Sequence, residues 1–331
     1  MMSKKVLVYP LLALILVAGL VHATVQNRAN QHAQLMVTEL IELFEDRGIN
    51  ISVGKLTVQP YSREVTARDL VIEMNDQPPH HVGVVRLTDI EFNQAQDFIL
   101  AMRVDVEQVI MTVTPQMADE IQPEVIWQTL QSLGMKDGQL AQHQSIYYRY
   151  NPELAQLQLR STSRVHHPDD IQKVLYEFDV STEFTQIPDL EQMLADLRTT
   201  EEQSNLSMRW LSTGLKTFSA VYVDKGWWPA YRSTAASLSG VTEQHFQYAS
   251  AEQVATWLWD LPFLPASAKQ TLIEASTDFI AADAPQFHFS VRALPPEGVN
   301  IPMAFMAAVM SPNAMENFFE FDLSLSMREN E

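Results

Sequence analysis

The first feature of the hydrophobic pattern is an uninterrupted apolar run near the N-terminus. No charged side chain occurs from Val6 to Ala23, and the run follows directly on Lys4 and Lys5. A helix over this run reaches about 27 Å, enough to cross the hydrocarbon core of a bilayer. Basic residues beside a membrane helix tend to stay in the cytoplasm. We therefore expect residues 1–23 to be a single-pass anchor that contacts a bacterial inner membrane through residues 6–23, with the bulk of the chain in the periplasm.

Two other interpretations of this run are open. The letters VHA at 21–23 fit a signal-peptide cleavage site, and a cytosolic protein could bury the run as its first helix. The pattern beyond residue 23 favours an uncleaved anchor, because Met36, Leu40 and Leu43 recur at helical spacing without an intervening Gly or Pro. Residues 24–48 are thus predicted to form an amphipathic helix that continues from the anchor.

Beyond residue 48 the helical period gives way to alternation. In YEFDVSTEF, Tyr176, Phe178 and Val180 lie on one side of an extended chain, and Glu177 and Asp179 lie on the other. Similar alternation occurs before residue 115, in PQFHFSVRAL, and in FFEFDLSLSM close to the C-terminus. Clean alternation is typical of antiparallel sheet with one covered face. Residues 49–187 are predicted to form a β-rich domain.

One predicted strand departs from simple alternation. Val104 and Val106 share one face, whereas Val109 and Met111 share the opposite one. An extra residue between the two halves of a strand changes the phase in this way. The pattern predicts a β-bulge or a crossing strand between Val106 and Val109.

Helical spacing returns after residue 187. The stretches SAEQVATWLWDLPF and SAKQTLIEASTDFIA have helical character and are separated by prolines. Residues 188–331 are predicted to be a mixed section, with helices within 188–282 followed by closing strands. The expected fold class is α+β, with antiparallel, curved β-sheets packed with a helical section and preceded by one N-terminal transmembrane helix.

Composition limits both the partners and the chemistry. The 331 residues include 41 acidic and 22 basic side chains, which gives a net charge of −19, and there is no cysteine. So acidic a chain repels the phosphate backbone, and we expect no nucleic-acid partner. Without cysteine the chain forms no disulfide, thiolate zinc site, iron–sulfur cluster or cysteine nucleophile.

Two histidine pairs, His80-His81 and His166-His167, are the first candidates for a metal site. Each pair lies beside prolines, and the second belongs to the stretch HHPDD. Neighbouring residues of an extended chain point to opposite faces, so such a pair seldom binds one ion. We interpret both pairs as solvent-exposed loop histidines and assign no metal ligand.

Asp224 and two tryptophan pairs are the other candidates. Asp224 ends a predicted strand, where a carboxylate can be catalytic or can cap the following helix, and we favour the cap. Trp227-Trp228 and Trp257-Trp259 fit a membrane interface or a binding mouth, but buried aromatic packing is the preferred interpretation. No nucleophile elbow, phosphate-binding loop or dinucleotide fingerprint occurs. We assign no catalytic and no cofactor-binding residue and expect a protein that is not an enzyme and has no cofactor.

The first third of the chain resembles the start of the AsmA-like family of bacterial envelope proteins. The resemblance covers about residues 1–115 and rests on the segments ISVGKLTVQPYSREVTARDLVIEM and VRLTDIEFN after a basic N-terminus and one membrane helix. Corresponding positions are occupied by Gly54, Val65, Asp69-Leu70, Leu87 and Asp89-Ile90. The resemblance implies a periplasmic β-groove with an apolar interior, associated with lipid movement or outer-membrane homeostasis.

The expected function is that of a non-enzymatic, membrane-anchored periplasmic protein whose β-groove handles lipid or a hydrophobic partner in envelope maintenance. A second possibility is an anchored structural or assembly protein that binds other envelope proteins and has a closed core without lipid. A third is an envelope hydrolase without a recognisable motif. The closing strand bears on this choice: we interpret Phe319, Phe321 and Leu323 as core against helices, and expect any groove before residue 115.

Overall fold

The computed structural model describes most of the chain beyond residue 48. The described residues are 49–59, 64–74, 80–94, 98–112, 123–135, 138–187, 190, 213–260, 265–282 and 285–327. The predicted anchor (1–23) and amphipathic helix (24–48) lie outside them. None of the helices in the described part combines the length and the hydropathy that crossing a bilayer requires.

Long strands dominate the described residues. They are β1 (Ile49–Gln59), β2 (Glu64–Met74), β3 (His80–Phe92), β4 (Ile99–Thr112), β5 (Gln139–Asn151), β6 (Gln156–His167), β7 (Asp170–Thr185), β8 (Gly214–Asp224), β9 (Pro285–Ala293), β10 (Val299–Asn300) and β11 (Phe319–Met327). The helices are α3 (Pro123–Ser132), α6 (Trp227–Leu238), α7 (Glu243–Trp259), α8 (Ala266–Ala281), α9 (Ile301–Met310) and the 3₁₀ helix Pro312–Asn317.

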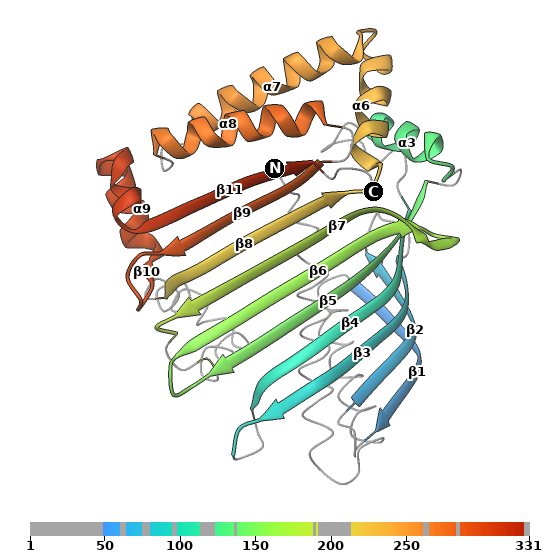
Figure 1. Ribbon diagram of the computed structural model, residues 1–331. Coiled ribbons are helices and arrows are strands. Elements are labelled where there is room, and N and C mark those ends of the chain that lie inside the picture. The colour runs from blue at the N-terminus through green and yellow to red at the C-terminus, as the bar shows by residue number, and fades with distance from the viewer. Residues whose placement is uncertain are drawn as a thin grey trace. The chain divides into compact units, whose positions relative to one another are not determined.

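The strands form one 11-stranded sheet in an almost sequential order (Figure 1). The order is β1-β2-β3-β4-β5-β6-β7-β8-β9-β11, and the short β10 pairs with β8. The pairings for which the register is known are antiparallel. Antiparallel neighbours need only a short connection, so each new strand extends the sheet beside the one before it.

The predicted α+β fold class is therefore wrong, because one large antiparallel sheet accounts for most of the described structure. The prediction gave the helices a section of their own, 188–282. In the structure α6, α7 and α8 occupy a single connection, and β9 on their far side pairs directly with β8. A helical insertion between two hydrogen-bonded strands lengthens the connection without interrupting the sheet.

The described residues fall into two compact units. Unit 1 comprises those within Met1–Arg149 and Ser161–Leu175, and unit 2 comprises those within Tyr150–Arg160 and Tyr176–Glu331.

The core of unit 1 is a set of apolar side chains from β1 to β5. One row of cross-strand partners runs Val58, Val65, Leu87, Val104 and Ile146, and every member is buried. Directly opposed apolar side chains of this kind stabilise neighbouring strands through packing as well as burial.

The alternation of unit 1 reverses along a second row, Gly54, Asp69, Gly83 and Gln108, which we call the phase-change row. These residues are neighbours across β1 to β4, and the residues immediately before and after each of them are paired without a register shift. Asp69 and Gln108 have left-handed backbones, with φ of 55° and 58°. Each faces a glycine: an added Cβ at Gly54 would lie 2.9 Å from Cβ of Asp69.

The predicted β-bulge is confirmed at Gln108, where the register between β4 and β5 shifts between Val106 and Val109. The extra residue explains why the odd-numbered Val109 packs against the same core as the even-numbered Val104. Asp69 has a matching effect in β2, since Val65 before it and Leu70 after it are buried in one core.

Unit 2 combines its strands with the helices (Figure 1). Helices α7 and α8 lie side by side, and α8 also contacts β9 and β11. At the other end of these strands, Val291, Ala293, Val299, Ala304 and Phe319 form a small buried cluster that includes one residue of α9.

Candidate functional site

A cavity of about 500 Å³ opens on unit 1. Part of its wall is a row of cross-strand partners, Val71, His81, Ile110 and Ala141, on β2 to β5. Its polar lining consists of Asp69, His81, Gln108, His143, His166 and Asp169. We call this cavity, defined by those six residues, the histidine pocket.

The phase-change row gives the pocket part of its shape. Asp69, Gly83 and Gln108 all line it. A Cβ on Gly83 would lie 2.5 Å from Oε1 of Gln108, so the missing side chain leaves room for Gln108 to lie over β3. Non-glycine residues with left-handed backbones are uncommon and cluster at functional sites, where the surrounding structure stabilises them.

The histidine pairs are not loop residues, and that interpretation is wrong. His80 lies in β3 and is 5% exposed, and His166 lies in β6 and is 3% exposed. Only the partner of His80 in sequence, His81, is exposed. The two histidines of a pair point to opposite faces of their strand, as expected of adjacent residues.

His166 has one ring nitrogen bound and the other free. Its Nδ1 lies 2.8 Å from the carbonyl oxygen of His167, and its Nε2 is buried without a hydrogen-bond partner. A carbonyl oxygen only accepts, so Nδ1 carries a proton, and in the tautomer with this single proton Nε2 is an acceptor. Leaving such an acceptor buried and unpaired costs about 1–3 kcal/mol.

His143, on β5, packs against His166. The ring centroids are 4.8 Å apart with the planes at 77°, and Nε2 of His143 is also buried without a hydrogen-bond partner. Burial lowers the pKa of His143, and the neighbouring His166 lowers it further. Both effects favour the neutral imidazole, whose unprotonated nitrogen accepts hydrogen bonds.

Unit 2 has a different feature, an apolar sheet face that the helices leave partly open. Three cross-strand rows build it: Phe178–Tyr222–Phe287, Val180–Ala220–Phe289 and Thr182–Phe218–Val291–Phe321. We call these side chains the apolar face of unit 2. Except for the buried Val291, the apolar members are only half-buried.

Helices contact this face at its two ends. Phe279 of α8 lies 5.7 Å from Tyr222 and 6.4 Å from Phe287, measured between ring centroids. At the other end, Phe321 packs against the buried cluster that includes Phe319. The interpretation of the closing strand as core thus holds for Phe319, which is 5% exposed, whereas Phe321 is half-buried and the side chain of Leu323 lies outside the described part.

Asp224 is a structural cap. It is 3% exposed and accepts hydrogen bonds from the backbone N–H of Gly226 at 2.8 Å and of Trp228 at 2.9 Å, at the start of α6. It also accepts from the hydroxyl of Tyr222 at 2.6 Å. Burial, together with the Asp224 carboxylate, raises the pKa of Tyr222, and burial raises the pKa of Tyr176 to about 12. Both phenols are neutral near pH 7, which suits packing and not proton transfer.

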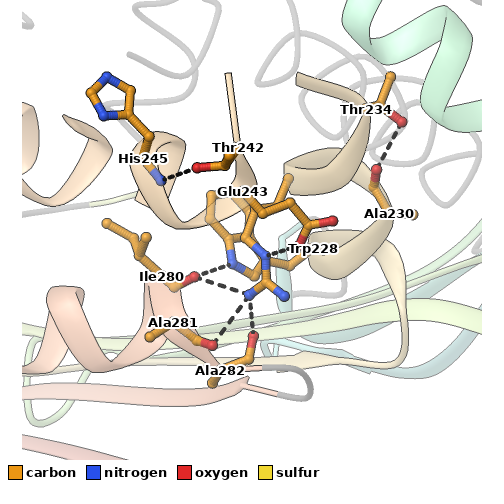
Figure 2. Close-up of polar contacts among 10 residues, drawn as sticks. Trp228, Ala230, Thr234, Thr242, Glu243, His245, Ile280, Ala281 and Ala282 are labelled. Atoms are coloured by element: carbon orange, nitrogen blue, oxygen red, sulfur yellow. Dashed lines mark hydrogen bonds and ion pairs between the residues drawn. The ribbon is translucent and has the colours of Figure 1, made fainter. Parts of the chain in front are cut away.

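Arg232 of α6 is a buried cation that donates to the end of α8. It is 6% exposed, and its Nη1 donates to the carbonyl oxygens of Ile280 (3.2 Å), Ala281 (3.2 Å) and Ala282 (3.1 Å). Figure 2 shows these three carbonyls together at the end of α8, with the carboxylate of Glu243 on the other side. Nε of Arg232 lies 3.4 Å from Oε2 of Glu243. Since α8 has no basic residue in its own last turn, Arg232 supplies the positive charge that a helix C-terminus favours.

The tryptophan pairs divide. The ring of Trp228 is 5.7 Å from those of Tyr231 and Phe279, so it packs among aromatic rings as expected, although it is half-buried and not fully buried. Its Nε1 donates to the carbonyl of Ile280 at 3.1 Å (Figure 2). Trp257 and Trp259 are 61% and 51% exposed, so the same interpretation is wrong for them.

No protein-family model matches the chain, and no curated protein is significantly similar to it in sequence.

Proposed function

We propose that this chain is a non-enzymatic protein of the bacterial cell envelope that holds lipid acyl chains, or the apolar part of a comparable ligand, against the apolar face of unit 2. In this proposal residues 6–23 anchor it in the inner membrane, and the bulk of the chain lies in the periplasm. The resemblance of residues 1–115 to AsmA-like proteins supports the envelope location, whereas the apolar face lies in unit 2 and not before residue 115, where we expected a groove.

The observation that carries the proposal is the half-buried state of the three rows. Phenyl rings and aliphatic side chains that alternate with polar residues normally lie in a closed core, because each exposed apolar Å² costs about 25 cal/mol. Here Phe178, Val180 and Phe289 stay half-buried although α8 and α9 contact both ends of the face. Contiguous apolar surface that stays partly accessible in this way is a candidate binding surface.

The expected ligand is apolar over much of its length. The other face of the same strands is more polar and includes Asp179 of β7, Ser219 of β8 and Ser290 of β9. An acyl chain gains about 0.8 kcal/mol for each CH₂ that it buries, so roughly ten buried CH₂ groups along the rows supply the free energy of micromolar binding, about 8 kcal/mol.

The experiment compares two substitutions on neighbouring residues of β9. Phe289→Asn places an amide on the apolar face, and Ser290→Asn places the same amide on the polar face as the matched control. The full-length protein and both variants are purified from membranes, extracted with organic solvent, and their lipids measured by mass spectrometry. A phenyl ring buried to this extent leaves roughly 50 Å² to cover, or about 1.2 kcal/mol, so F289N should retain several-fold less lipid than S290N. Equal lipid in both variants, or none in the wild type, would refute the proposal.

One observation favours a second function, the assembly of envelope proteins. Helix α9 has no charged residue, and Met303, Met306, Val309 and Met310 are 70%, 60%, 58% and 85% exposed. Exposed methionines adapt to many partner surfaces. A crosslinker at Met306 that recovers one defined envelope protein, with no lipid bound to unit 2, would support assembly in place of lipid handling.

A further inference from the structure

The histidine pocket of unit 1 is independent of the apolar face, because all its residues belong to the other unit. Its volume of about 500 Å³ lies within the usual range for small-molecule sites. Its wall is also built with special backbone geometry, since Asp69 and Gln108 are left-handed and face glycines.

The polar groups of the pocket call for hydrogen-bond donors. Nε2 of His166 is a buried acceptor without a partner on a residue that is 3% exposed, and its tautomer is determined by the carbonyl of His167. Asp69 and Asp169 add two carboxylates to the lining. A ligand that donates hydrogen bonds here replaces an unpaired acceptor with a paired one.

The charge of the pocket selects against anions. Among the described residues that line it, none is Lys or Arg, whereas two are Asp. A carboxylate or phosphate ligand would approach two carboxylates of the lining, and the charge of Arg164, which acts on His143, is opposed there by that of Glu107. The favoured ligand carries positive charge.

The same residues favour an organic cation over a metal ion. In the described part of the chain no group of three or more His, Asp or Glu side chains is placed to hold a metal. Val71, Ile110 and Ile171 line the pocket together with the polar groups, which suits a ligand with an alkyl portion. A bare ion would leave that apolar wall uncovered.

We propose that the histidine pocket binds a small primary alkylammonium ligand, whose N–H groups donate to the acceptors of His166, Asp69 and Asp169 and whose alkyl chain lies against Val71, Ile110 and Ile171. This is a binding site and involves no covalent step. It stands or falls separately from lipid handling by unit 2.

The test uses the full-length protein and a set of five-carbon probes that differ only at the head group. Pentylamine, 1,5-diaminopentane, 1-pentanol and pentanoate are titrated by calorimetry. The two amines should bind roughly tenfold or more tightly than the alcohol, because only they carry the charge that the aspartates favour. Equal binding of the alcohol, or preferential binding of pentanoate, overturns the proposal.

Variants then locate the binding. His166→Phe removes the acceptor and should weaken pentylamine roughly tenfold or more, while His166→Gln, which retains an accepting oxygen, should weaken it less. Asp169→Asn keeps the shape and removes one charge, so it provides a test that does not depend on how well H166F folds. His245→Gln, on an exposed residue of α7 in unit 2, is the control and should leave binding unchanged.

A spectroscopic signal distinguishes the pocket from adventitious binding. In ¹⁵N-imidazole spectra, Nε2 of His166 should shift from a free acceptor toward a hydrogen-bonded one as pentylamine is added. Binding that leaves the His166 and His143 signals unmoved, or Zn²⁺ binding to these histidines without any amine binding, contradicts the proposal.

Discussion

Removal of Arg232 should loosen the helices of unit 2. Arg232→Met keeps much of the length and apolar stem but cannot donate, so the carbonyls of Ala281 and Ala282 lose this donor and that of Ile280 keeps only Nε1 of Trp228. One Nη1 has two protons to share among three acceptors, which we count as two hydrogen bonds to a charged group, about 1.5–3 kcal/mol each. Some of these carbonyls regain water when the site opens, so the expected loss is about 3–4 kcal/mol.

The ion pair with Glu243 should contribute little to that loss. Glu243 is 45% exposed and its carboxylate lies 3.4 Å from the guanidinium. Exposed pairs of this kind contribute about 0.5 kcal/mol, so Glu243→Gln should be nearly silent. Arg232→Lys should fall between, because one ammonium cannot reproduce the planar fork.

Hydrogen exchange measured by mass spectrometry on the full-length protein is the assay, since it reports local opening of residues 266–282. R232M should speed exchange near the C-terminus of α8, and E243Q should not. Arg160→Met is the matched control, because Arg160 pairs with Asp179 on the surface, with 61% of its side chain exposed, and should cost at most about 1 kcal/mol. Unchanged exchange of 266–282 in R232M, or an equal effect of E243Q, would refute the reasoning.

Three further predictions concern single residues. Gly54→Val should lower stability by about 1–3 kcal/mol in urea unfolding, because its Cβ would meet Cβ of Asp69 at 2.9 Å; a neutral result would contradict the phase-change row. Burial lowers the pKa of His80 below its usual value of 6.5, and the neighbouring His81 lowers it further. Below pH 6.5 the unfolded chain therefore binds a proton that the folded chain does not. Stability is lost as the pH falls from 6.5 through the pKa of His80 in the folded protein. Urea unfolding at about pH 7.5 and about pH 5.5 should show a smaller difference for His80→Leu than for wild type, and an unaltered difference would count against a buried neutral imidazole. Asp224→Ala removes the carboxylate that accepts from the backbone N–H of Trp228, so it should lower the free energy of unfolding by about 1–2 kcal/mol and lower Tm. An unchanged Tm would contradict the role of Asp224 as a cap.

The strands of unit 2 were predictable because their alternation continues over most of their length, with a register shift in β7 only between Glu183 and Phe184. Phe178 and Val180 on one face and Asp179 on the other are a two-residue period that needs no tertiary information. The bulge at Gln108 was predictable for the same reason, since Val106 and Val109 are out of phase.

The phase-change row could have been found in the sequence but was not. Val65 and Ala67 are followed by Leu70 and Ile72, an odd-to-even change around Asp69 like the one recognised at Gln108. The alignment of Asp69 with Gly54 depends on strand register, which alternation alone does not determine.

The histidine pocket was out of reach for a further reason. His166 was assigned to a loop because HHPDD reads as a turn, yet the turn begins only after His167, where β6 ends. Its proximity to His143 on β5 comes from the pairing of distant segments. The fold class failed similarly: local periodicity detects the helices of 227–281 but does not reveal that β8 and β9 pair across them.

The most direct test of the central claim places a photoreactive benzoylphenylalanine at position 289 in the full-length protein inside cells. The matched control carries the same residue at position 290, on the opposite face of β9. Lipid handling by the apolar face of unit 2 predicts lipid adducts by mass spectrometry after illumination at position 289 and few at position 290. Absence of lipid adducts at 289, or equal amounts at both positions, would contradict it.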